Sequence, residues 1–286
     1  MLLHLTHHKC GTRWINSICH EICFALGKRW ESASNPGIFN HDLAAFARTS
    51  GVDFLSFTNA RYAFIGDLDD YRGFHVIRDP RDILVSSYFS SLKTHTDSNW
   101  PALTAHRQQL QEASTEEGLL LEMGFIADVF EALRDWNYGD DRILEVKMES
   151  LMQDNYSGLC RVFAHLGLLD QNDGSTSAVA AQTGALARLL VNRLYARTGG
   201  WSLLRLYPPT IPVLHFLGVV HRNRFEAKAR GRSRGQENKN SHYRKGQAGD
   251  WANHFTPKVE KAFKDTLGDL VVALGYDETN DWHAAS

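Results

Sequence analysis

The sequence predicts an α/β protein with a mostly parallel β-sheet of the P-loop type, flanked by helices on both faces. Two observations support this fold class. Short apolar runs alternate with helical patterns along the chain, an order typical of parallel sheets covered on both faces. In addition, the first apolar run leads through a tight turn into a helix start. With 286 residues, one domain spanning 1–286 is favoured over two.

The first elements follow from local patterns. An apolar strand over 2–6 precedes a helix over 12–26, which we expect to end at Gly27. A polar loop should then extend through Asn40, and further strands are predicted over 52–58 and 74–78.

The second part of the chain continues the alternation. A helix over 81–92 is followed by a capping box at Ser114, Thr115, Glu116 and Glu117, which opens a long helix to Asn137. The pattern then predicts a strand over 142–147, a helix near 155–166 and helical residues 177–197, with an apolar stretch over 211–220.

The turn after the first strand has the composition of a phosphate-binding loop. Lys9 places a positive charge at the turn, Gly11 permits a tight bend, and Thr12 adds a hydroxyl at the first turn of the helix. A helix N-terminus offers free backbone N–H groups and the positive end of the helix dipole to an anion. An ordinary strand–helix corner would give the same short pattern, so the turn alone decides nothing.

Two later segments also suit phosphate binding. Arg78 follows a predicted buried strand, and Asp79 and Pro80 signal the start of the next helix, which carries Ser86. Far downstream, Arg244, Lys245 and Gly246 form a dibasic loop that can close on a phosphate.

Together these segments resemble the sulfotransferases that use 3′-phosphoadenosine 5′-phosphosulfate (PAPS). Their Lys-x-Gly-Thr-x-Trp loop, Arg-x-Pro-x-Asp helix start with its later serine, and Arg-Lys-Gly-x-x-Gly-Asp-Trp loop are matched in the same order over nearly the whole chain. The matching residues are Lys9, Gly11, Thr12, Trp14, Arg78, Pro80, Asp82, Ser86 and Arg244 to Trp251.

The resemblance implies in-line transfer of a sulfuryl group from PAPS to a hydroxyl or amine of a small-molecule acceptor, leaving adenosine 3′,5′-bisphosphate (PAP). Lys9 would neutralise the leaving oxygen, and Trp14 would stack on adenine unless it is a plain core aromatic. The predicted cofactor residues are Lys9, Cys10, Gly11, Thr12, Arg13 and Trp14 around the 5′-phosphosulfate, and Arg78, Ser86, Arg244, Lys245 and Gly246 around the 3′-phosphate.

The usual catalytic histidine is missing. Where the cytosolic branch has Lys-Thr-His-Leu-Pro, this chain has Ser56, Phe57, Thr58, Asn59 and Ala60. Neither Thr58 nor Asn59 can accept a proton near neutral pH. By their spacing, Glu31 and then His41 are the candidate bases, ahead of His7 and His8, which lie closer to the cofactor. An amine acceptor that is already neutral would need no base.

We call the segment from Arg244 to Trp251 the closing loop. The dimer segment that usually follows it is not intact, because Ala252, Thr256, Pro257 and Lys261 occupy its places. Oligomeric state is therefore open, and Thr256 with Pro257 instead predicts a helix start.

The basic segment over about 221–245 is interpreted as a lid-like insertion. It is either a solvated covering after a core helix or a gate over the cofactor, with the apolar stretch before it as a wall of the acceptor pocket.

Net charge, apolar stretches and cysteine content limit the kinds of partner and the compartment that we expect. A formal net charge of −2 gives no support for a nucleic-acid binder that works by overall charge. No stretch has the roughly 18 uninterrupted apolar residues of a membrane helix. The four cysteines, in a chain without a secretory leader, are expected to be reduced, which predicts a cytoplasmic protein. Cys19 and Cys23 lack two further ligands at zinc spacing, so no metal site is predicted.

Two other functions fit part of the pattern. A phosphoadenosine-binding protein without catalysis would explain the missing histidine. A P-loop nucleotide kinase would share the architecture, but Gly-x-x-x-x-Gly-Lys-Ser/Thr is absent and Lys9 precedes its glycine. The identity of the acceptor does not follow from the sequence.

Overall fold

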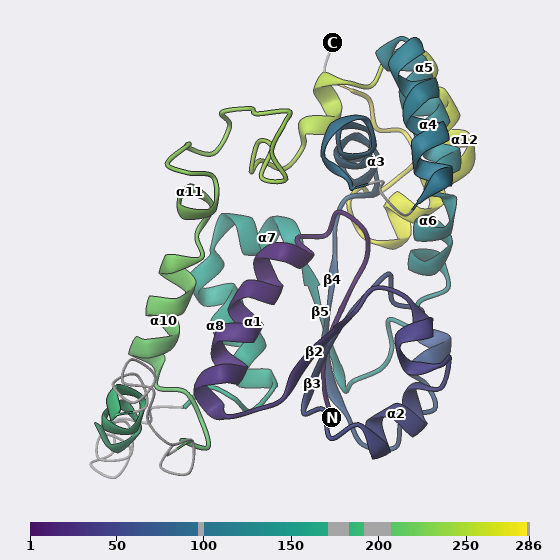
Figure 1. The fold of residues 1–286 in the computed structure, drawn as a ribbon. Coiled ribbons are helices and arrows are strands. Elements are labelled where there is room, and N and C mark those ends of the chain that lie inside the picture. The colour runs from purple at the N-terminus through teal and green to yellow at the C-terminus, as the bar shows by residue number, and fades with distance from the viewer. Residues whose placement is uncertain (97–99, 171–182, 192–206, 285–286) are drawn as a thin grey trace.

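The centre of the molecule is a five-stranded β-sheet (Figure 1). The structure is a computed structural model that describes residues 1–96, 100–170, 183–191 and 207–284. All pairings are parallel, in the order β2-β3-β1-β4-β5. The strands are β1 (Leu2–Thr6), β2 (Trp30–Ala33), β3 (Phe54–Thr58), β4 (Arg72–Ile77) and β5 (Ile143–Lys147).

The register brings the carboxyl ends of the strands to one edge. Thr6 of β1 lies level with Thr58 of β3 and Val76 of β4, and Ile77 pairs with Lys147 of β5. Open parallel sheets bind ligands at this edge, because the loops that leave neighbouring strands meet there.

The helices cover both faces and the carboxyl edge. Their bounds are α1 (Thr12–Leu26), α2 (Leu43–Thr49), α3 (Pro80–Phe89), α4 (Pro101–Glu112), α5 (Thr115–Phe125), α6 (Ala127–Arg134), α7 (Met148–Gln153), α8 (Asn155–His165), α10 (Val213–Arg222), α11 (Phe225–Lys228) and α12 (Pro257–Ala273). Single turns of other helix types are η1 (Pro36–Phe39), η2 (Tyr62–Phe64), η3 (Ser90–Thr94) and η5 (Asp250–Asn253).

Two apolar clusters hold these layers together. One joins the inner sides of α1, α3, α8, α10 and α12, with Ile15, Phe163 and Phe263 fully buried. The other lies on the opposite face of the sheet, where Leu3 and Leu5 of β1 pack with residues around η1 and α2. In Figure 1, α1, α8 and α10 lie on one side of the sheet and α2 on the other.

The predicted fold class is confirmed, with two local errors. The polar loop through Asn40 contains the edge strand β2 and the turn η1. The long helix to Asn137 is two helices, α5 and α6, because the chain leaves helical geometry at Ile126 (φ −106°, ψ 22°). The capping box at Ser114 and the N-cap at Thr256 are both present, each with its side-chain hydrogen bond.

The apolar stretch before the basic segment forms α10, a core helix. Phe216, Val219 and Val220 are buried, and α10 packs against α1 and α8. None of the residues 211–220 lines the cavity at the carboxyl edge of the sheet, and the interpretation of this stretch as a wall of the acceptor pocket stays a prediction. Parts of the predicted helix over 177–197 lie outside the described residues.

Candidate functional site

The loop between β1 and α1 is shaped to receive an anion. Lys9 and Gly11 both have left-handed backbone conformations (φ 67° and 78°). For a lysine this conformation is uncommon and costs free energy, which is typical of functional loops. The amides of Gly11, Thr12 and Arg13 have no hydrogen-bond acceptor within the described part of the chain, and no acidic residue lies in the first turn of α1. Nothing in that turn therefore competes with an anion for these N–H groups.

Arg78 connects this loop to the next strand. It follows β4 directly, is buried, and its Nη1 donates a hydrogen bond to the carbonyl oxygen of Lys9 (3.1 Å). Its second terminal nitrogen lies 3.7 Å from the carboxylate of Asp82. Asp79 caps the N-terminus of α3 by accepting from the amide of Arg81, so the helix that carries Ser86 begins beside the phosphate loop.

Asp82 joins the closing loop to α3. Its two carboxylate oxygens accept hydrogen bonds from the amides of Gly249 (2.8 Å) and Trp251 (3.0 Å). These residues are 167 and 169 positions away in sequence. The Asp of one motif is therefore the anchor for the backbone of another, which explains why both segments are needed to form one site.

Asp250 fixes the two cations of the closing loop. Its buried carboxylate accepts hydrogen bonds from Arg244 (2.5 Å) and from Lys245. Burial alone would raise its pKa, but hydrogen bonds from His254, Lys245 and Arg244 hold the pKa of Asp250 well below its usual range. The pair of cations is thus pre-positioned by a permanently ionised partner.

Gly246 lets the backbone of this loop pass close to an aromatic ring. Its φ is +64°, and a Cβ added there would overlap the ring of Phe225. Both properties exclude larger residues, so the closing loop and Phe225 form one packed unit.

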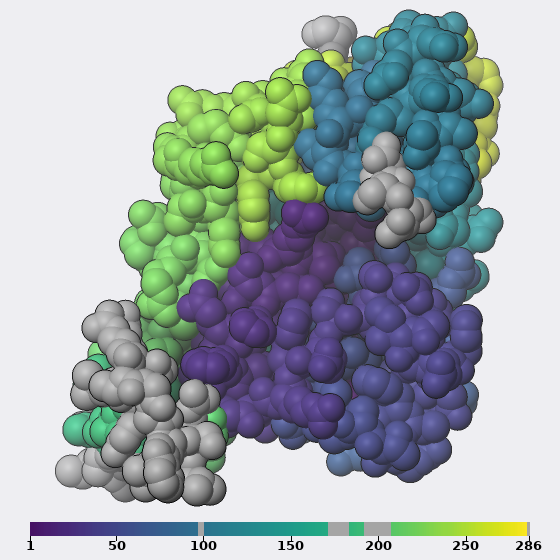
Figure 2. Space-filling model, in the orientation of Figure 1, coloured from purple at the N-terminus to yellow at the C-terminus, as the bar shows by residue number. Residues whose placement is uncertain are grey.

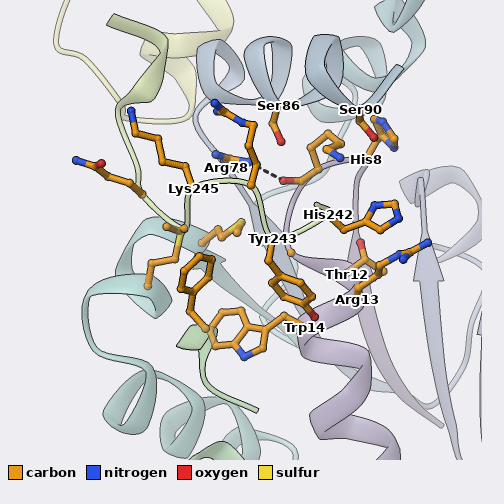
Figure 3. Close-up of a pocket in the computed structure, with 18 of the residues that line it drawn as sticks. His8, Thr12, Arg13, Trp14, Arg78, Ser86, Ser90, His242, Tyr243 and Lys245 are labelled. Carbon is orange, nitrogen blue, oxygen red and sulfur yellow. Dashed lines mark hydrogen bonds between the residues drawn. The ribbon is translucent and has the colours of Figure 1, made fainter. Parts of the chain in front are cut away.

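The three segments meet around a cavity of about 350 Å³ (Figure 3). Of the predicted cofactor residues, all line it except Cys10, which is buried beneath the loop and packs in the core. The lining residues among them are Lys9, Gly11, Thr12, Arg13, Trp14, Arg78, Ser86, Arg244, Lys245 and Gly246.

The cavity is strongly cationic. Six lysine and arginine side chains line it, and the described lining residues include no aspartate or glutamate: the cations are Lys9, Arg13, Arg78, Arg234, Arg244 and Lys245. Burial lowers the pKa of Lys9 to about 8, and the neighbouring guanidinium groups of Arg78 and Arg13 add to the effect. Arg78, Arg234, Arg244 and Lys245 each pair with a carboxylate that lies outside the lining. The cavity surface itself nevertheless presents cations and no described carboxylate, which favours a ligand with several negative charges.

The structure does not bring Glu31 or His41 to this cavity. Glu31 is exposed on the edge strand β2 and lies level with Leu55, three residues before the end of β3. His41 is exposed and lies beside Phe64, with a left-handed backbone (φ 61°). The spacing argument placed Glu31 in a loop, but the residue belongs to a strand, which fixes it away from the carboxyl edge.

Sequence reasoning missed two groups of lining residues. An apolar group consists of Met148, Met152, Phe225 and Tyr243, and the histidines His95 and His242 join His8, which the sequence had offered only as a lower-ranked candidate. Met148 comes directly after β5, so the strand-end argument could have found it. Met152 follows on the same helix, α7, and Phe225 begins α11, while the remaining residues come from loops whose position depends on tertiary packing. Figure 3 shows Trp14 and Tyr243 on one side of the cavity, and His242 beside Thr12 and Arg13.

The described residues lack two other kinds of feature. The described residues contain no group of three or more His, Cys, Asp or Glu side chains that could hold a metal ion. In the described ranges, no helix has both the length and the apolar character needed to cross a membrane.

Comparisons with known proteins give information on the fold. By sequence, the chain matches no protein-family model and no curated protein. By structure, it resembles mouse sulfotransferase SULT7A1 complexed with PAP, with a TM-score of 0.54 and 17% identity over 96% of this chain and 88% of that chain. The chain has the fold of a sulfotransferase.

A second solved structure is retinol dehydratase in complex with androsterone and inactive cofactor PAP. Its TM-score is 0.48 at 14% identity, covering 95% of this chain and 80% of that chain. The cavity lies at the carboxyl edge of the parallel sheet, which is where open parallel sheets bind ligands.

Proposed function

We propose that this protein is a sulfotransferase that uses PAPS to transfer a sulfuryl group to a hydroxyl or amine of a small molecule. The observation that carries the proposal is the convergence of three distant segments on one cationic cavity without a lining carboxylate. The mouse sulfotransferase of the same fold is complexed with PAP, a nucleotide with two phosphate groups. A site with cations on two sides suits such a ligand.

The residues fit the two phosphates separately. Lys9 and the amides of Gly11 and Thr12 would hold the 5′-phosphosulfate at the N-terminus of α1. Arg78, Ser86, Arg244 and Lys245 would hold the 3′-phosphate. Trp14, with Phe225 or Tyr243, offers an aromatic surface for adenine, because all three line the same cavity.

PAPS supplies the sulfuryl group, and the protein contributes position and charge. The bridging oxygen of the leaving group gains negative charge as its bond to sulfur breaks, and Lys9 is the cation placed to stabilise it. For the Nζ of Lys9, no hydrogen bond or ion pair occurs within the described ranges, so it is available for this role.

Two alternative functions can be distinguished from a sulfotransferase by the ligands that each would bind or convert. A phosphoadenosine-binding protein without catalysis would bind PAP and leave PAPS intact. A nucleotide kinase would bind ATP in preference to PAP.

The deciding experiment is calorimetry followed by turnover. We expect PAP to bind the full chain at least tenfold more tightly than ATP, because only PAP carries a 3′-phosphate. Incubation with PAPS and a panel of phenols, alcohols and amines should then give products heavier by one sulfuryl group in mass spectrometry. PAP binding without any PAPS consumption would support the inactive binder, and a preference for ATP would support the kinase.

A further inference from the structure

Sulfuryl transfer to a hydroxyl requires a proton acceptor near the acceptor oxygen. Thr58 lines the cavity at the end of β3, and Asn59 follows it, but neither side chain can take a proton near neutral pH. Glu31 and His41 lie elsewhere on the surface. Since no aspartate or glutamate occurs among the described lining residues, the proton acceptor must be sought among the other titratable side chains there.

Two of these side chains are unsuited to accept the proton. Lys9 is needed as a cation next to the leaving oxygen, and an anionic ligand favours its charged form. Burial raises the pKa of Tyr243, so its phenol stays protonated and is not a base at neutral pH. Three histidines therefore remain, namely His8, His95 and His242.

The three histidines differ in how they are held. His242 is exposed, on the segment that leads into the closing loop. The Nδ1 of His95 donates to the carbonyl oxygen of Thr96 (3.2 Å), and its ring packs edge-on against Trp100 (5.4 Å between centroids). His8 lies on the short loop between β1 and α1, directly before Lys9, and this loop is fixed at both ends by regular structure.

The ring of His8 is free and faces the cavity. It has no hydrogen-bond partner within the described residues, and its nearest aromatic neighbour is His95, at 5.6 Å between ring centroids. Burial, with the nearby charges of Lys9 and His95, lowers the pKa of His8 well below 6.5. The imidazole is therefore neutral at physiological pH and carries a lone pair that can accept a proton.

We propose that His8 is the general base that takes the proton of the acceptor hydroxyl, a role that rests on the proposed sulfotransferase function. In the step, the acceptor oxygen bonds to sulfur while the bond from sulfur to the bridging oxygen breaks. PAP leaves with that electron pair beside Lys9, the acceptor proton moves to a ring nitrogen of His8, and water later removes it. One rigid loop thus carries both the base and the cation that stabilises the leaving group.

The test does not require the natural acceptor, because water can serve in its place. We expect His8→Asn to lower the rate at which the full chain converts PAPS and water into PAP and sulfate by at least about 100-fold, the usual contribution of a general base. PAP affinity, measured by calorimetry, should stay within threefold of wild type. His41→Asn, at an exposed histidine outside the cavity, is the control, and we expect it to change the rate by less than threefold. The losses in His95→Asn and His242→Asn should be smaller than the loss in His8→Asn, and a larger loss in either would overturn the assignment.

Two further readouts separate a base from a structural residue. In His8→Ala, added imidazole should restore the rate at least tenfold, because it can enter the vacated space and accept the proton. Since His8 is neutral down to below pH 6.5, the wild-type rate should be constant from pH 6.5 to 7.5, and its acid decline should begin lower.

A measurement without turnover completes the test. In NMR titrations, PAP should raise the pKa of His8 by at least half a unit through its negative charge, while exposed His41 should not respond. A full rate in His8→Asn, loss of rate without imidazole rescue, or an unshifted His8 would each overturn the assignment. If wild type binds no PAP at all, the proposed function itself fails; if it binds PAP and keeps its rate in His8→Asn, only the assignment of His8 fails.

Discussion

Arg244 and Lys245 are held by the buried carboxylate of Asp250, whereas the rings of His8 and His242, in the same cavity, have no hydrogen-bond partner among the described residues. We call the first group, with Lys9, Arg78 and Ser86, the phosphate end, and His8, His95 and His242 the histidine end. The closing loop of the phosphate end is fixed in advance by Asp82 and Asp250.

This contrast separates the roles proposed for the two ends. Arg244 and Lys245 are already held in place, so they can bind a phosphate at little cost in side-chain ordering. The ring of His8 has no hydrogen-bond partner among the described residues, so it is free to exchange a proton with an acceptor. The space-filling view shows a hollow in the surface between the N-terminal residues and the segments around α3 and the closing loop (Figure 2). We therefore expect substitutions at the two ends of the cavity to have different effects on binding and turnover.

The largest effect is expected at Lys9. In Lys9→Met, the rate of PAPS consumption should fall by about 10²–10³-fold, because a charge that develops in the transition state loses its partner. PAP affinity should fall by less than tenfold. Lys245→Met is the matched control within the phosphate end, and it should weaken PAP binding more than it slows turnover. Steady-state kinetics and calorimetry measure both quantities, and equal losses in the two variants would make Lys9 a simple binding residue.

Lys9 also gives the phosphate end a pH dependence. Its pKa of about 8 means that the free protein loses this positive charge as pH rises through 8. PAP affinity should therefore be higher at pH 7 than at pH 9, and Lys9→Met should remove most of the difference. A wild-type affinity that is constant over this range would contradict the placement of Lys9 beside a phosphate.

A smaller effect on PAP affinity should separate backbone strain in the closing loop from contact of that loop with Phe225. Gly246 and Gly249 both have positive φ (64° and 74°), but a Cβ at Gly246 meets Phe225 whereas a Cβ at Gly249 meets nothing within 4 Å. Both alanine variants carry the same backbone strain, of the order of 1 kcal/mol. We expect Gly246→Ala to weaken PAP binding several-fold more than Gly249→Ala. Equal affinities in calorimetry would show that contact with Phe225 does not set the loop.

The last effect is on stability and not on ligand binding, and it concerns the support behind the phosphate loop. His7, which starts that loop, shares a hydrogen bond with His75 (2.9 Å between Nε2 atoms), and the Nδ1 of His75 lies 2.8 Å from Glu145. Burial raises the pKa of Glu145 to about 8. The folded state therefore binds this proton more tightly than the unfolded chain, with its ordinary carboxyl pKa near 4.5, so the contribution to stability is complete below pH 4.5 and is lost as pH rises to 8.

Glu145→Gln stays neutral at every pH and tests this linkage. Wild type should lose free energy of unfolding relative to the variant between pH 4.5 and 8, by up to about 1.4 kcal/mol per pH unit. Denaturant unfolding at several pH values measures the difference, with exposed Glu112→Gln as the control. Parallel curves for wild type and Glu145→Gln would show that the carboxyl is ionised in the folded protein.

Part of the phosphate end was predictable because its residues lie near strand ends and helix starts. Arg78 follows β4 directly, and Lys9 and Gly11 lie in the short turn between β1 and α1, so local patterns give their position before any tertiary contact is known. Arg244 and Lys245 lie in a loop, and only the dibasic motif pointed to them. The exposed placement of Glu31 was not predictable from spacing, because a short polar-looking segment pairs as the edge strand β2.

The histidine end was less accessible to sequence reasoning. His242 lines the cavity on the segment that leads into the closing loop, and Asp82 of α3 holds that loop through the amides of Gly249 and Trp251, more than 160 residues away in sequence. His8 was visible in the sequence but ranked below Glu31 and His41, since its distance from an acceptor could not be judged without the loop geometry.

The central claim is that the cavity at the carboxyl edge binds a phosphoadenosine through its 3′-phosphate. Calorimetry with PAP and AMP, which lacks that group, tests it most directly on wild type and Arg78→Ala. Each charge-assisted bond to a phosphate contributes about 1.5–3 kcal/mol. We expect wild type to prefer PAP, and Arg78→Ala to weaken PAP binding at least tenfold while leaving AMP binding nearly unchanged. Equal losses for both nucleotides, or no preference for PAP in wild type, would contradict it.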